Sequence, residues 1–237
     1  MTKPPDHLHP DQHLLEHEYR PPPGETVEGR PETIASVADH LIRHFGQPET
    51  VWHETESVLV HIDVHVVRPQ RSGDGIVLVT SGMSDRPMRT PEAAPCARFA
   101  ELMMVLPDDW PLGREAFRSE SNYWPIRWLR MLARFPHRYD TWLGHGHTVP
   151  NGDPPEALAP GVGFCGMLVA DPRGRDADFS PFTATDGRLI SIYALWPLYA
   201  SELAHKLRHG TEALLERLAE RGVGEMIRPG RADVCQG

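Results

Sequence analysis

The apolar residues between positions 31 and 46 recur with the period of an amphipathic helix. They are Ile34, Val37, Ala38, Leu41, Ile42 and Phe45. Residues three and four positions apart share one side of an α-helix, so this spacing gives the segment a single apolar face. Gly46 follows at a position where helices commonly end. The pattern therefore predicts a helix that lies with one side against a sheet.

Residues 58–69 ("VLVHIDVHVVRP") alternate between two classes of side chain. One face of the predicted strand would carry Val58, Val60, Ile62, Val64 and Val66, and the other would carry Leu59, His61, Asp63, His65 and Val67. We interpret the second face as polar and half-exposed. Apolar runs at residues 75–82, 97–107, 162–170 and 188–199 predict further strands.

Two later segments return to helical spacing. Residues 121–136 have Ser121 or Asn122 as a candidate cap and Pro136 as a stop, and their apolar face is Trp124, Trp128, Met131, Leu132 and Phe135. Residues 200–223 predict one helix, or two helices separated near Gly210, with a buried stripe of Leu203, Leu207, Leu214 and Leu218.

This order of elements predicts an α+β fold in which a mixed, largely antiparallel β-sheet is covered by helices. We place this single domain at residues 31–237. Residues 1–30 are rich in proline, histidine and acidic residues, and they contain too few apolar side chains to offset the entropy of ordering. We therefore expect a disordered N-terminal arm.

Composition narrows the classes of function. The formal net charge of -9 argues against a nucleic-acid partner, because nucleic-acid-binding domains usually present a basic stripe. Cys96, Cys165 and Cys235 are far apart and lack a Cys-x-x-Cys spacing, which fits a reducing compartment. The sequence shows neither the apolar core of a signal peptide nor an apolar window of about 20 residues. We expect a cytoplasmic protein with no membrane partner.

The stretch "VTSGMSDRPM" raises the question of a catalytic serine at Ser81 or Ser84. A nucleophile elbow requires Gly-x-Ser-x-Gly, but Ser84 is followed by Asp85 and Arg86. The hydroxyls are better explained by a tight turn at the end of a strand. With no phosphate-binding loop, dinucleotide fingerprint or His-Glu-x-x-His in the sequence, we expect neither catalysis nor a cofactor.

An alternative function is a metal-dependent hydrolase. His61, Asp63 and His65 would share a strand face, and His145 or His147 from the "GHGH" segment could complete a zinc site with a bound water. Residues two apart on a strand are about 6.5 Å apart, so these side chains converge only where the strand twists or bulges.

Five stretches have a combination of residues that is familiar from one family. They are residues 79–88, 100–112, 123–154, 163–169 and 192–210, the longest being "YWPIRWLRMLARFPHRYDTWLGHGHTVPNGDP". In this order they closely resemble the suppressor of fused (SUFU) domain in its bacterial, single-domain form. The resemblance extends from about residue 34 to residue 234.

The resemblance implies a protein-binding function. Animal members are non-enzymatic cytoplasmic regulators that hold a transcription-factor peptide as an added strand between two domains, and this chain resembles only the first of these domains. Their Gly-Asp-His motif is replaced here by Gly146-His147-Thr148. Bacterial members occur near secreted polymorphic toxins, which implies a role as immunity proteins, and an acidic chain would attract a basic toxin.

We therefore expect a module that sequesters a protein partner. The predicted partner-binding residues lie at the end of the "VTSGMS" strand and in the long loop of residues 141–161, where Leu143 would be a second apolar anchor beside the tryptophan. They are Ser81, Ser84, Trp142, His145, His147, Asn151 and Asp153. The oligomeric state is left open, because an exposed strand edge could also pair with a second copy of the chain.

Overall fold

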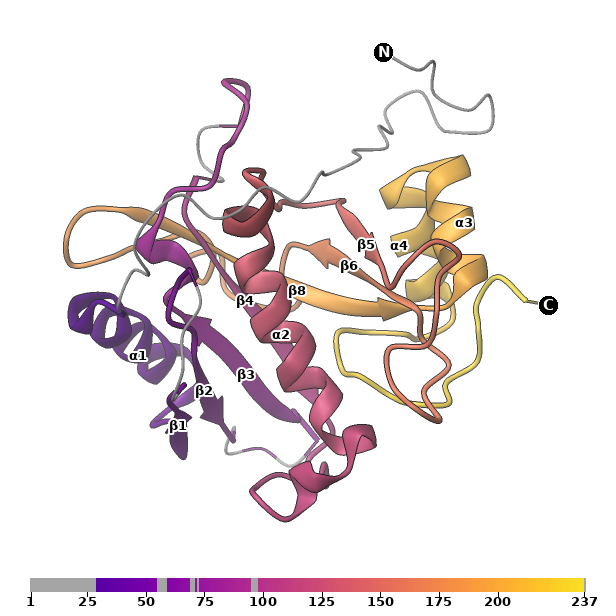
Figure 1. Cartoon of the computed structure of the whole chain (residues 1–237), viewed down its shortest axis with the longest axis horizontal. Helices are drawn as coiled ribbons and strands as arrows, with labels where there is room; N and C mark the ends of the chain where they lie inside the picture. Colours follow the sequence, from indigo (N-terminus) through magenta and orange to yellow (C-terminus); the bar gives the residue numbers. More distant parts are fainter. Residues whose placement is uncertain (1–28, 55–58, 69–70, 72, 95–97, 237) are drawn as a thin grey trace.

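A computed structural model describes residues 29–54, 59–68, 71, 73–94 and 98–236. The predicted arm at residues 1–30 therefore lies outside the described residues, except for Gly29 and Arg30. Figure 1 shows a single layer of strands with helices on both of its faces. The predicted α+β class is confirmed.

The sheet is mixed and largely antiparallel. Its strands are β1 (Thr50–Trp52), β2 (Asp63–Val67), β3 (Ile76–Ser81), β4 (Ala100–Leu106), β5 (Thr148–Pro150), β6 (Gly166–Ala170), β7 (Phe182–Thr183) and β8 (Leu189–Leu198). Their order across the sheet is β1-β2-β3-β4-β8-β6-β5, with β7 paired to β8. The β4–β8 pair is parallel, whereas the other strand pairs are antiparallel.

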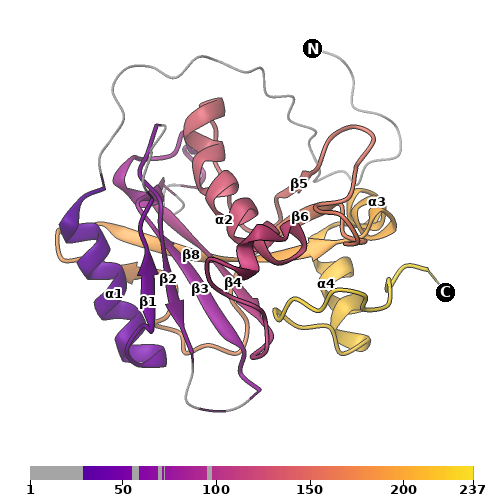
Figure 2. The same cartoon turned by 60° about the horizontal axis from the view of Figure 1, so that its bottom comes forward.

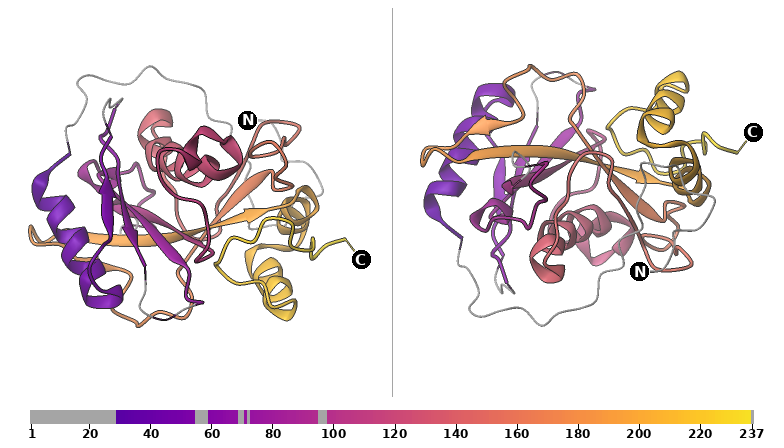
Figure 3. Two further views of the ribbon diagram at one scale, coloured as in Figure 1. Left: turned by 90° about the horizontal axis from the view of Figure 1, so that it is seen from below. Right: turned by 90° about the horizontal axis from the view of Figure 1, so that it is seen from above.

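The helices are distributed over both faces of the sheet. They are α1 (Pro31–Phe45), α2 (Glu120–Tyr139), α3 (Ala200–His209) and α4 (Thr211–Glu220), with short 3-10 turns η1 (Met83–Asp85) and η3 (Ala116–Arg118). On one face, Trp124, Trp128 and Leu132 of α2 pack against alternate residues of β2, β3 and β4. The opposite face is covered by α1 at one end and by the α3–α4 pair at the other (Figures 2 and 3).

Coverage of both faces corrects the prediction for residues 58–69. All five residues of β2 are buried, and Asp63 and His65 have no exposed surface. The face predicted as half-exposed lies on the side of the sheet that α1 covers, where Val67 packs in one cluster with Val37 and Leu41. Apolar and polar residues do alternate along this segment, but the polar side chains form hydrogen bonds inside the protein and do not contact water.

The boundaries of α1 and of the α3–α4 pair agree with the sequence pattern, but the buried face of α1 does not. Its buried residues are Thr33, Ser36, Val37, His40 and Leu41, whereas Ile42 is 38% exposed. Polar contacts set this rotation, since His40 hydrogen-bonds the carbonyl of Phe179 at 2.8 Å. Gly210, at φ 88°, separates α3 from α4, so the two-helix alternative is correct.

Helix α2 is longer at both ends than the sequence suggests. It begins at Glu120, with Ser119 as the N-cap residue in place of Ser121 or Asn122. Pro136 lies inside the last turn, where it removes one helical hydrogen bond, to the carbonyl of Leu132, but the helix continues past it and the N–H of Asp140 bonds the carbonyl of Pro136. The helix ends only when Asp140 adopts a left-handed conformation at φ 51°. Within the described residues, no helix has both the length and the apolarity needed to cross a bilayer.

Candidate functional site

The long loop of residues 141–161 contains the short edge strand β5. Hydrogen bonds connect His147 to Val169 and Asn151 to Cys165, each at 2.8 Å. In an antiparallel pair, residues that bond the neighbouring strand alternate with residues that do not. Thr148 therefore directs its N–H and C=O away from β6, and Pro150 directs its C=O away as well. Among the described strands, β5 pairs only with β6. Its outer edge therefore presents backbone groups to a further strand.

Trp142 and His147 form one unit beside this edge. Their rings meet edge to face with centroids 4.3 Å apart, and Trp142 is half-buried against the core. Gly144 allows this arrangement, because a Cβ atom there would lie 2.6 Å from the indole ring. Leu143, by contrast, is buried in the core and is not available to a partner.

The other predicted loop residues have different surroundings. His145 is exposed, and its ring nitrogens lie 3.1 Å from Asp171 and 3.2 Å from Glu212. The hydrogen bond to Asp171 raises the pKa of His145, with a smaller contribution from Glu212. Asn151 donates its amide to the carbonyls of Glu156 and Ala157 and so shapes the loop. Asp153 is exposed at the loop tip.

An open cleft of about 550 Å³ separates β5 from α2. Its β5 side includes Val149, Pro150 and Asn151, and its α2 side carries the arginines Arg127, Arg130, Arg134 and Arg138 together with Met131, Phe135 and Tyr139. Arg127 and Arg134 pair with Glu120 and Glu54. Arg130 donates Nη2–H to the carbonyl of Trp52 at 2.9 Å, and its Nε atom is buried without a hydrogen-bond acceptor among the described residues. Strand edge and cleft together make a groove lined by apolar side chains and by the arginines of α2.

Ser81 and Ser84 do not contribute to this surface. Both are buried, with exposed fractions of 1% and 0%. Ser81 Oγ is hydrogen-bonded to His65 Nε2 at 2.9 Å, and Ser84 donates its hydroxyl to Glu101 Oε1 at 2.7 Å. Because both hydroxyls are enclosed, neither residue can touch a partner or a substrate. The expected turn is present as η1, but its serines bond side chains of neighbouring strands rather than nearby backbone.

Glu101 is the buried residue that organises this turn, and the sequence reading overlooked it. It accepts hydrogen bonds from the Thr80 hydroxyl at 2.6 Å and from the N–H groups of Gly82 and Ser84 at 3.0 Å, in addition to the Ser84 hydroxyl. Burial raises the pKa of this carboxyl, and the hydrogen bonds oppose the shift. An isolated acid within the apolar run "AELMMVL" was the available signal.

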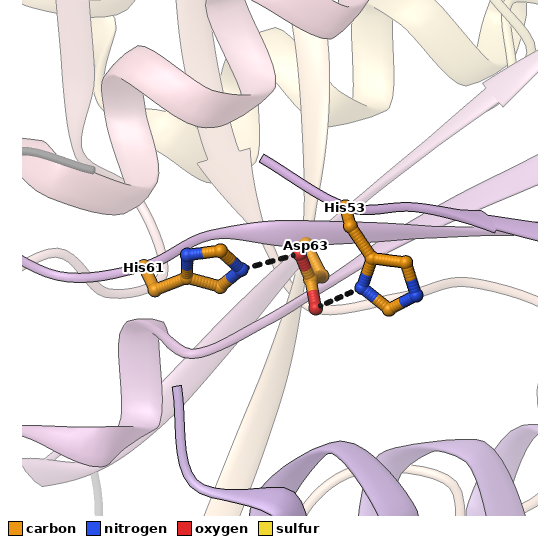
Figure 4. A group of neighbouring side chains, drawn as sticks. All are labelled: His53, His61 and Asp63. Carbon is orange, nitrogen blue, oxygen red and sulfur yellow. Dashed lines mark hydrogen bonds and ion pairs between the residues drawn. The ribbon is translucent and has the colours of Figure 1, made fainter. Parts of the chain in front are cut away.

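The metal hypothesis is corrected in its ligands. His65 bonds Ser81, His145 bonds Asp171 and Glu212, and His147 packs on Trp142, so none of them approaches a common ion with His61 and Asp63. The histidine that does join His61 and Asp63 is His53, which follows β1 directly (Figure 4). Strand register places it there: Trp52 pairs with Val64, so the next residue lies opposite Asp63. No spacing within one segment could reveal that contact.

Comparison with known proteins supports a single family. Among solved structures, a bacterial protein from Neisseria gonorrhoeae FA 1090 that is described as a SUFU homologue has a TM-score of 0.62 at 17% identity, over 87% of this chain and 98% of that chain. A chain of the Sufu–Fu complex gives 0.57 at 14% identity, over 87% and 93%. Drosophila Suppressor of Fused gives 0.61 at 14% identity, over 92% of this chain and 52% of that chain.

These identities establish a shared fold and nothing finer, and this chain spans about half the length of the Drosophila protein. No curated protein sequence matches it. The model of the family "Suppressor of fused protein (SUFU)" matches residues 59–232, which is most of the chain. Because this family model matches most of the chain, and because the structure has the fold expected of the family, the chain belongs to the suppressor of fused family.

Proposed function

We propose that this protein is a non-enzymatic module that sequesters a protein partner by accepting an extended segment of it along the outer edge of β5. The observation that carries the proposal is the edge of β5 at Thr148, which no other described strand pairs with and which lies beside the cleft between β5 and α2. Membership of the family supports it, as does the existence of a Sufu–Fu complex among the structural relatives.

The added strand would gain affinity from the backbone and selectivity from side chains. Thr148 offers one N–H and one C=O, and the C=O of Pro150 offers a second acceptor. Pro150 has no N–H, so pairing beyond it weakens, and the recognised segment is short. The Trp142–His147 pair gives an aromatic contact at one end of the strand, since β5 begins at Thr148.

Charge acts at two distances. The formal net charge of -9 would attract a basic partner before contact, although salt limits this attraction to about 10 Å. Inside the cleft the sign reverses, because four arginines of α2 line it. We therefore propose that the captured segment carries a carboxylate facing these arginines, even where the partner as a whole is basic. A secreted toxin domain, with this protein as its immunity protein, meets that description.

The test begins with the product of the gene beside this one, co-purified with the full chain and titrated by calorimetry. Replacing Thr148 with proline removes the outward N–H but no hydrogen bond to β6. We expect T148P to weaken binding about tenfold or more, equivalent to about 1.4 kcal/mol, and T148A to leave it unchanged. Equal affinities for both variants, with matching melting temperatures, would refute recognition at this edge.

Light scattering on the same samples distinguishes the remaining alternative. If the isolated protein is a dimer that T148P converts to a monomer, the β5 edge pairs with a second copy of the chain rather than with a foreign segment. Protection of cells that express the neighbouring gene product as a toxin, lost in T148P but kept in T148A, would support the immunity role.

A further inference from the structure

A cluster of His53, His61 and Asp63 lies far from β5, at the other end of the sheet. Asp63 Oδ2 is 2.9 Å from His53 Nδ1, and Asp63 Oδ1 is 2.8 Å from His61 Nε2. One ligand atom from each residue falls within 4.8 Å of the other two. Figure 4 shows the two rings directed at the carboxylate from opposite sides. We propose that this cluster binds a divalent transition-metal ion of the Zn²⁺ type.

The donor set suits such an ion. Two imidazole nitrogens and one carboxylate oxygen are common Zn²⁺ ligands, with bond lengths of about 2.0–2.2 Å. Ligand atoms around one tetrahedral ion are then about 3.3–3.5 Å apart. The present nitrogen–oxygen spacings of 2.8 and 2.9 Å, which go to different oxygens of Asp63, must therefore open by roughly half an ångström. The two histidines can supply this movement, because the side chain of His53 is 67% exposed and that of His61 is 23% exposed, whereas that of Asp63 is fully buried.

The buried carboxylate is held in place before any ion arrives. The N–H of Glu54 donates to Asp63 Oδ1 at 3.1 Å, which fixes the orientation of the group. Within the described parts of the chain, the ion pairs of Asp63 are those with His53 and His61. The nearby Arg134 is paired with Glu54 instead. A divalent cation would therefore supply positive charge to a buried carboxylate that has no arginine or lysine partner there.

The position of the ligands indicates a structural role. His53 directly follows β1, His61 lies two residues before β2, and Asp63 begins β2. One ion would join the residue that follows β1 to the start of β2, as structural metal ions join separate segments of a chain. The site lies on the β1–β2 side of the sheet and the proposed partner edge is β5, so the metal proposal stands independently of the proposed function.

The test uses the full, untagged chain, stripped with EDTA, dialysed, and titrated with ZnCl2 by calorimetry and elemental analysis. We expect one Zn²⁺ per chain and, at about 100-fold excess over Kd, a melting temperature raised by roughly 5–10 °C. His53→Ala should abolish both effects and, because that side chain is exposed, should fold normally. His209→Ala, another exposed histidine, should retain both effects.

A spectroscopic measurement separates this cluster from the histidines near the N-terminus. Co²⁺ in place of Zn²⁺ should give tetrahedral visible absorption bands in the wild type and in H209A, and none in H53A or H61A. The proposal is overturned by the absence of stoichiometric metal in the wild type, or by unchanged stoichiometry and affinity in H53A, since the metal would then belong to other residues.

Discussion

At the scale of single residues, buried polar side chains carry much of the specificity of this fold. Asp63, His65 and Glu101 are each without exposed surface, and hydrogen bonds from neighbouring strands or loops engage all of them. A buried charged or polar group costs several kcal/mol when it is unpaired, at about 1–3 kcal/mol for each unsatisfied partner. These residues therefore select one strand register and one turn geometry among many that the apolar residues would tolerate.

Glu101 gives the sharpest residue-scale prediction. Replacing it with alanine leaves Thr80, Ser84 and the N–H of Gly82 without their acceptor. We expect E101A to lower the free energy of unfolding by about 3 kcal/mol or more, and E101Q, which keeps one acceptor oxygen, by about 1–2 kcal/mol. Urea unfolding measures both. The matched control is Glu115→Ala, because 75% of the Glu115 side chain is exposed; a loss in E101A no larger than in this control would contradict the role.

At the scale of elements, turns are governed by backbone geometry that residue type only hints at. Gly82 connects β3 to η1 at φ 113°, and Gly210 separates α3 from α4 at φ 88°. Glycine was recognisable at both places in the sequence. The atoms that surround each glycine in the fold were not recognisable, and these atoms decide whether another residue is tolerated there.

Gly82 and Gly222 form a matched pair for testing this point. A Cβ atom at Gly82 would lie 1.9 Å from the carbonyl oxygen of His61, whereas one at Gly222 would meet no atom within 4 Å. Both have positive φ, so each alanine variant bears a left-handed penalty of about 1–2 kcal/mol. We expect G222A to lose about that amount and G82A to lose at least twice as much or fail to fold. Similar melting temperatures for the two variants would show that the backbone around Gly82 and His61 can shift to accommodate a Cβ atom without loss of stability.

At the scale of the whole molecule, coverage of both sheet faces encloses several histidines. Burial lowers the pKa of His40, His65 and His137 to about 4 in each case. The unfolded chain binds protons at these residues below about pH 6.5, but the folded protein does not. Their contribution to stability is therefore complete above pH 6.5 and is lost as the pH falls from 6.5 toward 4.

This linkage predicts acid unfolding well above the usual range for carboxylates. Each histidine should cost about 2 kcal/mol of stability between pH 7 and pH 5, and the sum approaches the total stability of an ordinary domain, about 5–15 kcal/mol. Urea unfolding at the two pH values measures the loss. His137→Gln should reduce the difference, while His209→Gln at the surface should not. A stability that is flat over this interval would show that these side chains are hydrated in solution.

The sequence alone determined the main helices and strands, the fold class and the family, but it did not reveal the short strands β1, β5 and β7. Periodicity needs only local information, because a residue's position on a helix or strand face follows from its neighbours in the chain. The breaks at Gly46 and Gly210 were therefore readable, as were the strands around "IVLVTS" and "ISIYALWPL". Helix α2 passed its predicted stop at Pro136 because a proline removes the hydrogen bond to the carbonyl four residues before it, while the residues that follow can still bond theirs.

Only the tertiary structure decided which polar residues face water and which meet one another. The second face of β2 is polar in sequence yet buried, since α1 lies over it. Ser81 and Ser84 were predicted on the partner surface but lie in the interior, because neighbouring elements cover them too. The union of His53 with His61 and Asp63 depends on the register of two strands, and the cleft beside β5 depends on where α2 crosses the sheet. Such contacts join segments far apart along the chain, and a local pattern contains no information about that distance.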